Sequence, residues 1–339
     1  MIETPTVLIL GAGASKPYGF PTSKNFCKDV EIAIRNLEKE KRYYLYRKLK
    51  YKSLSIFDEF IGKLKYADPP SIDAFLDDQD KKFFPIGKIG IARALLPYEK
   101  PGEFLFQYSD NPNIEIYPGG HWYQILWWRL RDGCRELKYF GRNNLTIITF
   151  NYDRSLEYYL FTTLTRGFPD TTTWEEHEKL CKEQLDQGVK VIHIYGKLGE
   201  LPWQTDDGSR EVNYGTETTN CDLLIRCADN IKTISEARTD TQDSKFVEIL
   251  NENGRIYFLG FGYHPENLEI LGINKLRTGK EVGGTCKGLS LRRKKDFLSL
   301  LIEAGYPDRE FVRSGQVTTL NDCFPEEYIY KFLDKVVVF

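Results

Sequence analysis

The stretch Leu145-Thr146-Ile147-Ile148-Thr149-Phe150-Asn151-Tyr152-Asp153 decides how the chain is organised. It begins as a short apolar run and ends with an amide and a carboxylate one residue apart. Such a run is typical of a strand buried inside a parallel sheet. In open α/β sheets, ligands bind at the carboxyl ends of the strands. Asn151 and Asp153 are therefore candidates for holding a polar ligand and a water.

Further apolar runs have the same character, and stretches with helical periodicity follow them. The strands are expected at 6–10, 145–150, 189–195 and 255–259, and helices at 22–39, 154–164, 266–273 and 289–304. Strands that alternate with helices predict an α/β fold with a doubly wound parallel sheet of the Rossmann type.

The intervening segments differ in composition from these core stretches. We expect one domain whose core segments are about 5–37, 143–204 and 244–310, with a largely helical insertion at about 38–142 and a polar insertion or lid at about 205–243. The Trp-rich stretch from Trp122 to Leu130 is expected to be core or a subunit interface.

Composition limits the functional class. The 339 residues carry a formal charge of -2, so nucleic acid is not expected as a direct ligand. The basic stretches 39–52 and 292–295 fit solvated helix faces better. No run of 18 apolar residues exists, and no basic region precedes an apolar stretch at the N-terminus. We therefore expect a cytoplasmic protein without a membrane span.

The seven cysteines are scattered through the sequence, and no Cys-x-x-Cys pair occurs. A structural zinc site normally needs two close pairs of ligands. The sequence therefore predicts no metal site and reduced, mostly buried thiols.

Two glycine-rich loops follow predicted strands: Gly11-Ala12-Gly13-Ala14-Ser15 and Gly260-Phe261-Gly262-Tyr263-His264. The bare amides of such a loop can approach a pyrophosphate, although a structural turn has the same pattern. Dehydrogenases also need a third glycine and an acidic residue about twenty positions on. Here Pro17 lies in that stretch and Asp29 lies inside a predicted helix, which disfavours hydride transfer.

Taken together and in order, these segments resemble the sirtuin family in the form used by bacterial anti-phage defence proteins that consume NAD. Gly11 to Ser15 with Gly19-Phe20-Pro21 is similar to the sirtuin segment that covers NAD, and Asn151-Tyr152-Asp153 is similar to the sirtuin Asn-Ile-Asp. Gly260-Phe261-Gly262 and residues 284–288 resemble the turns on the adenine side. Ser71-Ile72-Asp73-Ala74-Phe75-Leu76 resembles a segment that recurs in the bacterial branch.

The resemblance implies roles for particular residues. Asn151 would hold a water and the ribose near the reactive carbon, and Asp153 would contact the nicotinamide carboxamide. The NAD-binding residues that it implies are Gly11, Ala12, Gly13, Ser15, Phe20, Pro21, Gly260, Phe261, Gly262, His264 and Lys287.

One departure concerns the catalytic histidine, which sirtuins place directly before a glycine at a strand end. Here that pair is Tyr195-Gly196, and His193 stands two residues earlier. Residues two apart on a strand face the same way. His193 is therefore our first candidate, and Tyr195 in the histidine position is the alternative. The sequence is also compatible with structural roles for both histidines. His193 fits a buried core histidine, and His264 fits a residue that caps a helix.

The second departure is the missing four-cysteine zinc module, with which sirtuins build a cleft for acyl-lysine. Water then becomes the expected acceptor, and the chain is expected to be an NAD+ hydrolase with NAD as its substrate. The alternatives are an NAD-dependent protein deacylase and a non-catalytic scaffold that senses NAD or ADP-ribose. The resemblance also implies a homo-oligomer and a HerA-like hexameric ATPase as a partner.

Overall fold

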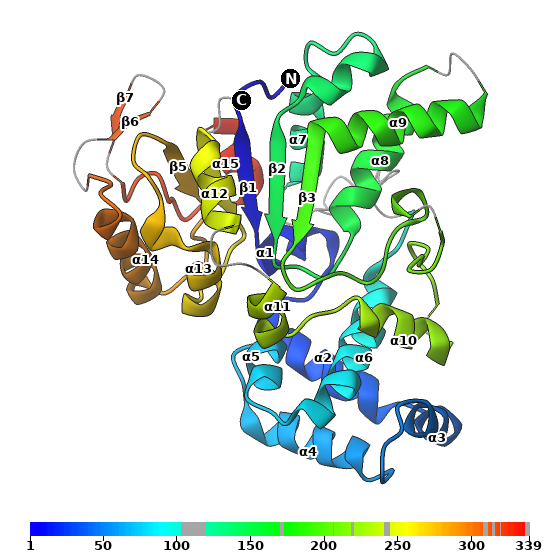
Figure 1. Ribbon diagram of the computed structural model, residues 1–339. Coiled ribbons are helices and arrows are strands. Elements are labelled where there is room, and N and C mark those ends of the chain that lie inside the picture. Colours follow the sequence, from blue (N-terminus) through cyan, green and yellow to red (C-terminus); the bar gives the residue numbers. More distant parts are fainter. Residues whose placement is uncertain are drawn as a thin grey trace, which may run out of the picture.

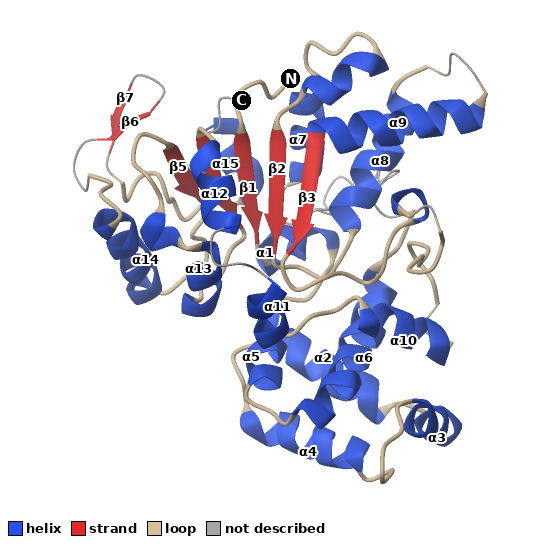
Figure 2. Cartoon of the chain, viewed as in Figure 1, coloured by secondary structure: helices blue, strands red, loops and turns tan. Residues whose placement is uncertain are grey.

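A five-stranded, all-parallel sheet forms the centre of the molecule (Figures 1 and 2). The computed structural model describes the chain except residues 103–119, 170–172, 206, 218–219, 241–244, 308–310, 314–315, 319 and 336–339. The strand order is β3-β2-β1-β4-β5. The strands are β1 (Thr6–Leu10), β2 (Leu145–Thr149), β3 (Val189–His193), β4 (Arg255–Leu259) and β5 (Glu281–Gly284). The prediction of a doubly wound α/β fold is confirmed.

The central strand β1 is buried along its whole length because β2 and β4 pair with it on either side. Leu10 lies opposite Thr149 of β2 and Leu259 of β4, so these three strands end at one edge of the sheet. The chain builds β2 and β3 on one side of β1 and then crosses to build β4 and β5 on the other. The loops after β1 and β4 therefore meet at the switch point, where such sheets bind ligands.

Helices cover both faces of the sheet. In Figure 1, α12 (Lys245–Glu252) lies in front of the strands, and α7 (Trp122–Arg131) and α15 (Ile329–Lys335) lie behind them. The remaining helices of the sheet layer are α8 (Ser155–Gly167), α9 (Trp174–Gly188), α13 (Pro265–Leu271) and α14 (Leu291–Glu303). Among the residues described, no helix combines the length and the apolar character needed to cross a membrane.

A separate group of helices stands at the carboxyl ends of the strands, below the arrowheads in Figure 1. It contains α2 (Ser23–Arg35), α3 (Lys39–Lys48), α4 (Ile56–Ala67), α5 (Ile72–Asp77) and α6 (Phe84–Leu95). Helix α2, which the sequence analysis assigned to the core, packs on α4 and α6 in this group. Helices α10 (Cys221–Asp229) and α11 (Ile234–Asp240) of the polar insertion pack on α6 and α5.

The Trp-rich helix α7 belongs to the sheet layer and not to this group. Trp122 and Trp127 are buried, whereas Trp128 is 56% exposed. The Trp122 indole Nε1 donates a hydrogen bond to the Ala14 carbonyl oxygen at 2.8 Å. The helix therefore supports the glycine loop that follows β1.

Several elements differ from the sequence-based expectation. A loop was expected at 283–288, but Gly283 and Gly284 end the strand β5, where they pair with Tyr257 and Phe258 of β4. A Cβ on Gly284 would lie 2.5 Å from the Phe258 carbonyl oxygen, so a glycine allows this close pairing. The strand expected at 189–195 ends at His193. No periodicity in the sequence predicted helix α1 (Ala12–Ser15), the pair β6 (Phe311–Arg313) and β7 (Gln316–Thr318), or the 3-10 helices Lys16–Tyr18, Lys81–Phe83, Leu96–Tyr98, Leu137–Arg142, Pro202–Gln204 and Ile273–Lys275.

Candidate functional site

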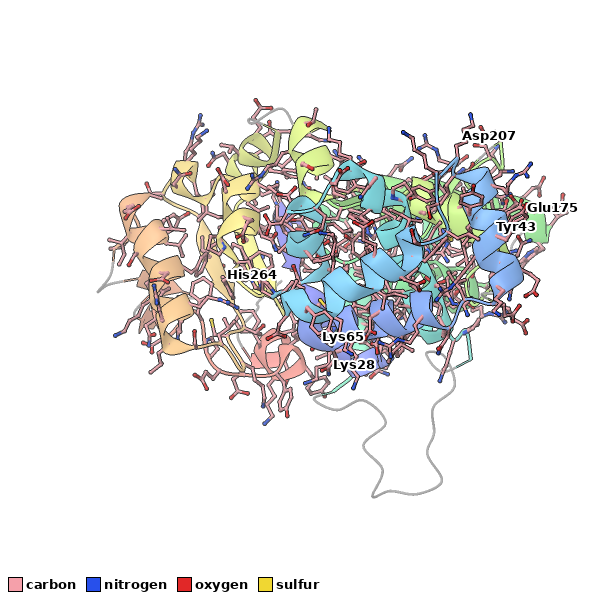
Figure 3. All side chains as sticks on the ribbon, turned by 90° about the horizontal axis from the view of Figure 1, so that it is seen from below. Lys28, Tyr43, Lys65, Glu175, Asp207 and His264 are labelled. Atoms are coloured by element: carbon pink, nitrogen blue, oxygen red, sulfur yellow. The ribbon has the colours of Figure 1, made fainter. Side chains whose placement is uncertain are left out.

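A cleft of about 750 Å³ lies at the switch point, between the carboxyl ends of the strands and the helical group. The loops after β1, β2, β4 and β5 form one side, and residues 70–74 with Leu95 form the other. This volume is within the range of sites that bind small molecules and cofactors. Figure 3 looks onto this side of the molecule, where His264 lies between the helices of the β5 side and the helical group.

Most residues predicted for the site come together in this cleft. The predicted residues that line it are Gly11, Ala12, Gly13, Ser15, Phe20, Pro21, Asn151, Asp153, Tyr195, Gly260, Phe261, Gly262, His264 and Lys287. His193 does not line the cleft.

The glycines after β1 allow two loops to touch backbone to backbone. A Cβ on Gly13 would lie 2.7 Å from the Gly260 carbonyl oxygen, and Gly260 itself has φ +57°. The amides of Gly11, Gly13 and Ala14 already donate to protein carbonyl oxygens. Three amides of the first loop are therefore already engaged, and its glycines serve close packing.

Other amides at the cleft remain free. The backbone N–H groups of Ala12, Phe261 and Gly262 donate to no other described residue. The turn after β4 is held rigidly, because Gly260 N donates to Thr285 Oγ1 at 2.9 Å and the Tyr263 ring is buried. An anion would therefore find its amide donors mainly at the turn of residues 260–264.

Asn151 is fixed at every polar group except one. Its amide N donates to Thr149 Oγ1 at 3.1 Å, and its Nδ2 donates to the Gly11 carbonyl oxygen and Ser15 Oγ, both at 3.0 Å. The Gly11 carbonyl oxygen can only accept, so the Nδ2 orientation is determined. Oδ1 forms no hydrogen bond with a described residue and is left as an acceptor at the cleft.

Asp153 is buried beneath the same loop. Its Oδ2 accepts from Ser15 Oγ at 2.7 Å, and its Oδ1 accepts from the amide of Ser155 at 3.2 Å and from the Ser155 hydroxyl. Burial raises the pKa of the carboxyl above its ordinary value, although the two serines oppose this shift. Asp153 thus ties the loop after β1 to the start of α8.

His193 lies behind Asn151 and outside the cleft. Its Nδ1 is 2.9 Å from the Asn151 carbonyl oxygen, and its Nε2 is 3.0 Å from Glu157 Oε1. Both neighbours are acceptors when Glu157 is ionised, so a protonated ring would donate from both nitrogens. Burial favours the neutral Glu157, but the charges of His193 and Lys197 outweigh it and lower the pKa of this carboxyl well below its ordinary range.

This placement does not fit the expectation that the His193 ring reaches the ribose from the face shared with Tyr195. That expectation assumed a strand through residue 195, whereas the strand ends at His193 and residues 194 and 195 form a turn. Alternation of side chains does not continue through a turn. Tyr195 lines the cleft, and His193 does not.

Tyr195 belongs to a polar wall that faces the helical group. Its hydroxyl donates to Asn267 Oδ1 at 2.6 Å. Beside it, the Tyr152 hydroxyl donates to Asp73 Oδ1, and burial raises the pKa of the Asp73 carboxyl. Asp73 is a cleft residue to which the motif resemblance gave no role, although residues 71–76 are one of its segments.

Cations gather on the β5 side. Lys287 and Arg293 line the cleft there, and Arg293 Nη1 is 3.4 Å from the Gly262 carbonyl oxygen. Burial and the charge of Arg293 lower the pKa of His264, which is therefore neutral at pH 7. The Lys287 ammonium lies over the ring of Tyr328, 3.2 Å from its centroid.

The C-terminal segment completes this side of the cleft with Glu327, Tyr328 and Ile329. It is held against β5 by hydrogen bonds from Gly284 N to the Cys323 carbonyl oxygen and from Cys286 N to the Pro325 carbonyl oxygen. No motif marks these residues, so the sequence offered no signal for them.

Within the described residues, no three His, Cys, Asp or Glu side chains are grouped so that they could hold a metal ion. No protein-family model matches the sequence, and no curated protein matches it.

Proposed function

We propose that the protein is an NAD+ hydrolase. The reaction is NAD+ + H2O → nicotinamide + ADP-ribose + H+, in which the nicotinamide–ribose N-glycosidic bond breaks and a C–O bond to water forms. The observation that carries the proposal is Asn151, whose single free polar atom, Oδ1, is an acceptor at the carboxyl edge of the sheet. A fixed amide oxygen can hold a water or a ribose hydroxyl in place.

The chemistry needs positioning more than acid catalysis. The nicotinamide of NAD+ is cationic and leaves as a neutral amide, so no side chain has to protonate it. The transition state resembles an oxocarbenium ion, as in glycoside hydrolysis. Pre-positioning of the water and the ribose can contribute several kcal/mol. In this proposal Asn151 orients the water. Asp153 fixes the position of Ser15 and of the loop after β1 relative to Asn151.

The charge distribution of the cleft supports one orientation of the dinucleotide. The free amides of Phe261 and Gly262 lie on the side of Lys287 and Arg293, which suits a diphosphate. Asp73 and the two tyrosines lie at the other wall and would face the nicotinamide riboside. Glu327 reduces the positive charge on the diphosphate side without cancelling both cations.

Incubation of the purified protein with NAD+, followed by chromatography of free nicotinamide, tests the proposal. We expect release that needs no acyl-lysine peptide and resists chelators. Strict dependence on an acylated peptide would instead support a deacylase.

Asn151→Ala should lower turnover by about two to three orders of magnitude, the scale lost with one preorganised polar group. Asn274→Ala is the matched control, because Asn274 is exposed and lies outside the cleft. Unchanged turnover in a folded Asn151→Ala protein would overturn the site assignment.

A non-catalytic scaffold that senses NAD or ADP-ribose is the second candidate, and Tyr195 favours it. A tyrosine stands where the resembled enzymes have a histidine, and its proton is committed to Asn267. Tight binding of ADP-ribose without nicotinamide release would support this candidate.

The biological setting that we propose rests on the motif resemblance alone. It is NAD depletion in the bacterial cytoplasm during anti-phage defence, by a homo-oligomer that works with a HerA-like hexameric ATPase.

A further inference from the structure

Asp73 is a half-buried carboxylate of the cleft that forms no ion pair with a described residue, and it lies on the wall opposite Glu327, Lys287 and Arg293. Its Oδ1 accepts from the Tyr152 hydroxyl, and its Oδ2 accepts from no other described residue. No Lys, Arg or His of the described chain forms an ion pair with it. Asp153 is instead satisfied by serines, and Glu266 is exposed to water.

Helix α5 holds Asp73 in this position. Ser71 caps the helix by accepting a hydrogen bond from the Ala74 amide at 3.1 Å, while Ile72, Phe75 and Leu76 are buried. The backbone that carries the carboxylate is therefore anchored from both sides. Its charge is directed into the cleft by the helix packing and not by a flexible loop.

The surroundings of Asp73 add further negative potential. The pKa of Tyr195 is raised first by burial and then by the charges of Asp73 and Glu266, while the charge of Arg238 opposes this shift. A partly buried carboxylate that forms no ion pair with a described residue gains from a positively charged ligand. Oxidised NAD has one cationic part, the nicotinamide ring, and reduced NAD has none.

We propose that Asp73 is a specificity-determining residue that selects the oxidised, cationic form of the dinucleotide and directs its nicotinamide end to the Tyr152 side. This inference rests on the proposed function, because it assumes that the cleft binds NAD. It adds a reason why the reduced form, which cannot release a neutral nicotinamide, binds the site more weakly. The selection acts through charge at the ring and leaves binding of the ADP half unchanged.

The test measures binding, so turnover does not interfere. The ligands are carba-NAD+, in which a CH2 group replaces the ring oxygen of the nicotinamide ribose and prevents cleavage, and its neutral dihydro form. Isothermal titration calorimetry gives the dissociation constant of each for the full chain. We expect the wild type to bind the cationic ligand about tenfold more tightly, as one partly buried charge contact supplies.

Asp73→Asn removes the charge with little change in shape and should reduce the ratio to within about twofold, by weakening the cationic ligand alone. Asp73→Ser is a second neutral variant in case the first does not fold, and Asp73→Glu should keep most of the ratio. Asp78→Asn is the matched control, because Asp78 follows the same helix but is exposed and outside the cleft.

The outcomes separate the inference from the function on which it rests. An unchanged ratio in a folded neutral variant, or equal loss of both ligands, would overturn the role of Asp73 while NAD binding stands. A wild type that binds the cationic ligand and the neutral dihydro ligand equally would also overturn the role of Asp73. If the wild type binds neither ligand, the proposed function itself fails.

Discussion

His193 and Glu157 form a buried pair directly behind the residue that is central to the proposed site. Their side chains are 6% and 5% exposed, and the imidazole Nδ1 also lies 2.9 Å from the Asn151 carbonyl oxygen. In this arrangement His193 is a positioning residue, since it acts on Asn151 from outside the cleft. Removing one partner of a buried pair leaves an uncompensated charge.

We predict that His193→Ala destabilises the fold by about 3 kcal/mol, the usual scale for such a pair. It should also lower turnover about tenfold by loosening Asn151. Urea unfolding and nicotinamide release measure the two effects. The double variant with Glu157→Gln should cost clearly less than the sum of the single changes, because both act on one unit. If His193→Ala left the stability unaltered but abolished turnover, His193 would have a direct catalytic role. Tyr195→Phe, which changes a residue within the cleft, serves as the comparison.

His121 makes the fold sensitive to acid. Burial lowers its pKa from 6.5 to about 4, and its Nδ1 lies 3.2 Å from the Tyr18 hydroxyl. Because the pKa in the folded state is below that of the unfolded chain, the unfolded state binds more protons between these values. The stabilisation from neutral His121 is therefore full above about pH 6.5 and is lost as the pH falls toward 4.

The expected loss in that window is roughly 2–3 kcal/mol of unfolding free energy. His121→Gln, which stays neutral, should flatten the pH dependence by this amount in urea titrations at pH 7 and pH 4.5. Parallel curves for the wild type and the variant would show that another group causes the acid sensitivity.

At the scale of elements, the contact between the loops after β1 and β4 holds the two halves of the sheet together at the cleft. A Cβ on Gly260 would lie 2.2 Å from the Ala14 amide nitrogen, and its φ is +57°. Gly279 provides a matched comparison, since its φ is +85° but a Cβ there would have no neighbour within 4 Å.

Gly279→Ala should therefore cost about 1 kcal/mol of stability, which is the conformational penalty alone. Gly260→Ala should cost at least about 2 kcal/mol more, because two backbones must also separate. Denaturant unfolding of both variants measures the difference. Equal costs would mean that the loops can move apart freely and that their contact does not shape the cleft.

At the scale of the whole molecule, the exposed apolar residues point to the surfaces through which copies would associate. Trp128 on α7 is 56% exposed, and Leu291 at the start of the basic helix α14 is 72% exposed. The other large apolar residues of α7 are buried or partly buried, so its aromatic contribution to an interface is reduced to Trp128. Aromatic and arginine side chains are enriched at interface hot spots.

We expect light scattering of the isolated chain at micromolar concentration to show a homo-oligomer, which Trp128→Glu or Leu291→Glu shifts toward smaller species. Trp174→Glu is the control, because Trp174 is also exposed, at 51%, but lies on α9. A wild-type monomer that is fully active on NAD+ would remove the reason for expecting assembly.

The amino-acid sequence by itself determined four of the five strands and much of the cleft wall. The runs 6–10 and 255–259 form strands with the expected bounds, because a strand buried on both faces needs a continuous apolar run and a glycine stops it. Parallel strands bring their carboxyl ends to one edge, so Asn151, Asp153 and the two glycine loops had to lie near one another. These conclusions depend on local periodicity and on one general rule of topology.

Only the tertiary structure decided which face each remaining side chain takes. The turn after His193 separates it from Tyr195, α5 brings Asp73 to Tyr152 from 79 residues away in the sequence, and residues 327–329 close the β5 side. Each of these depends on packing between segments that are distant in the chain, and neither periodicity nor residue spacing encodes such contacts. The identity of the groups facing the cleft is therefore a property of the folded molecule.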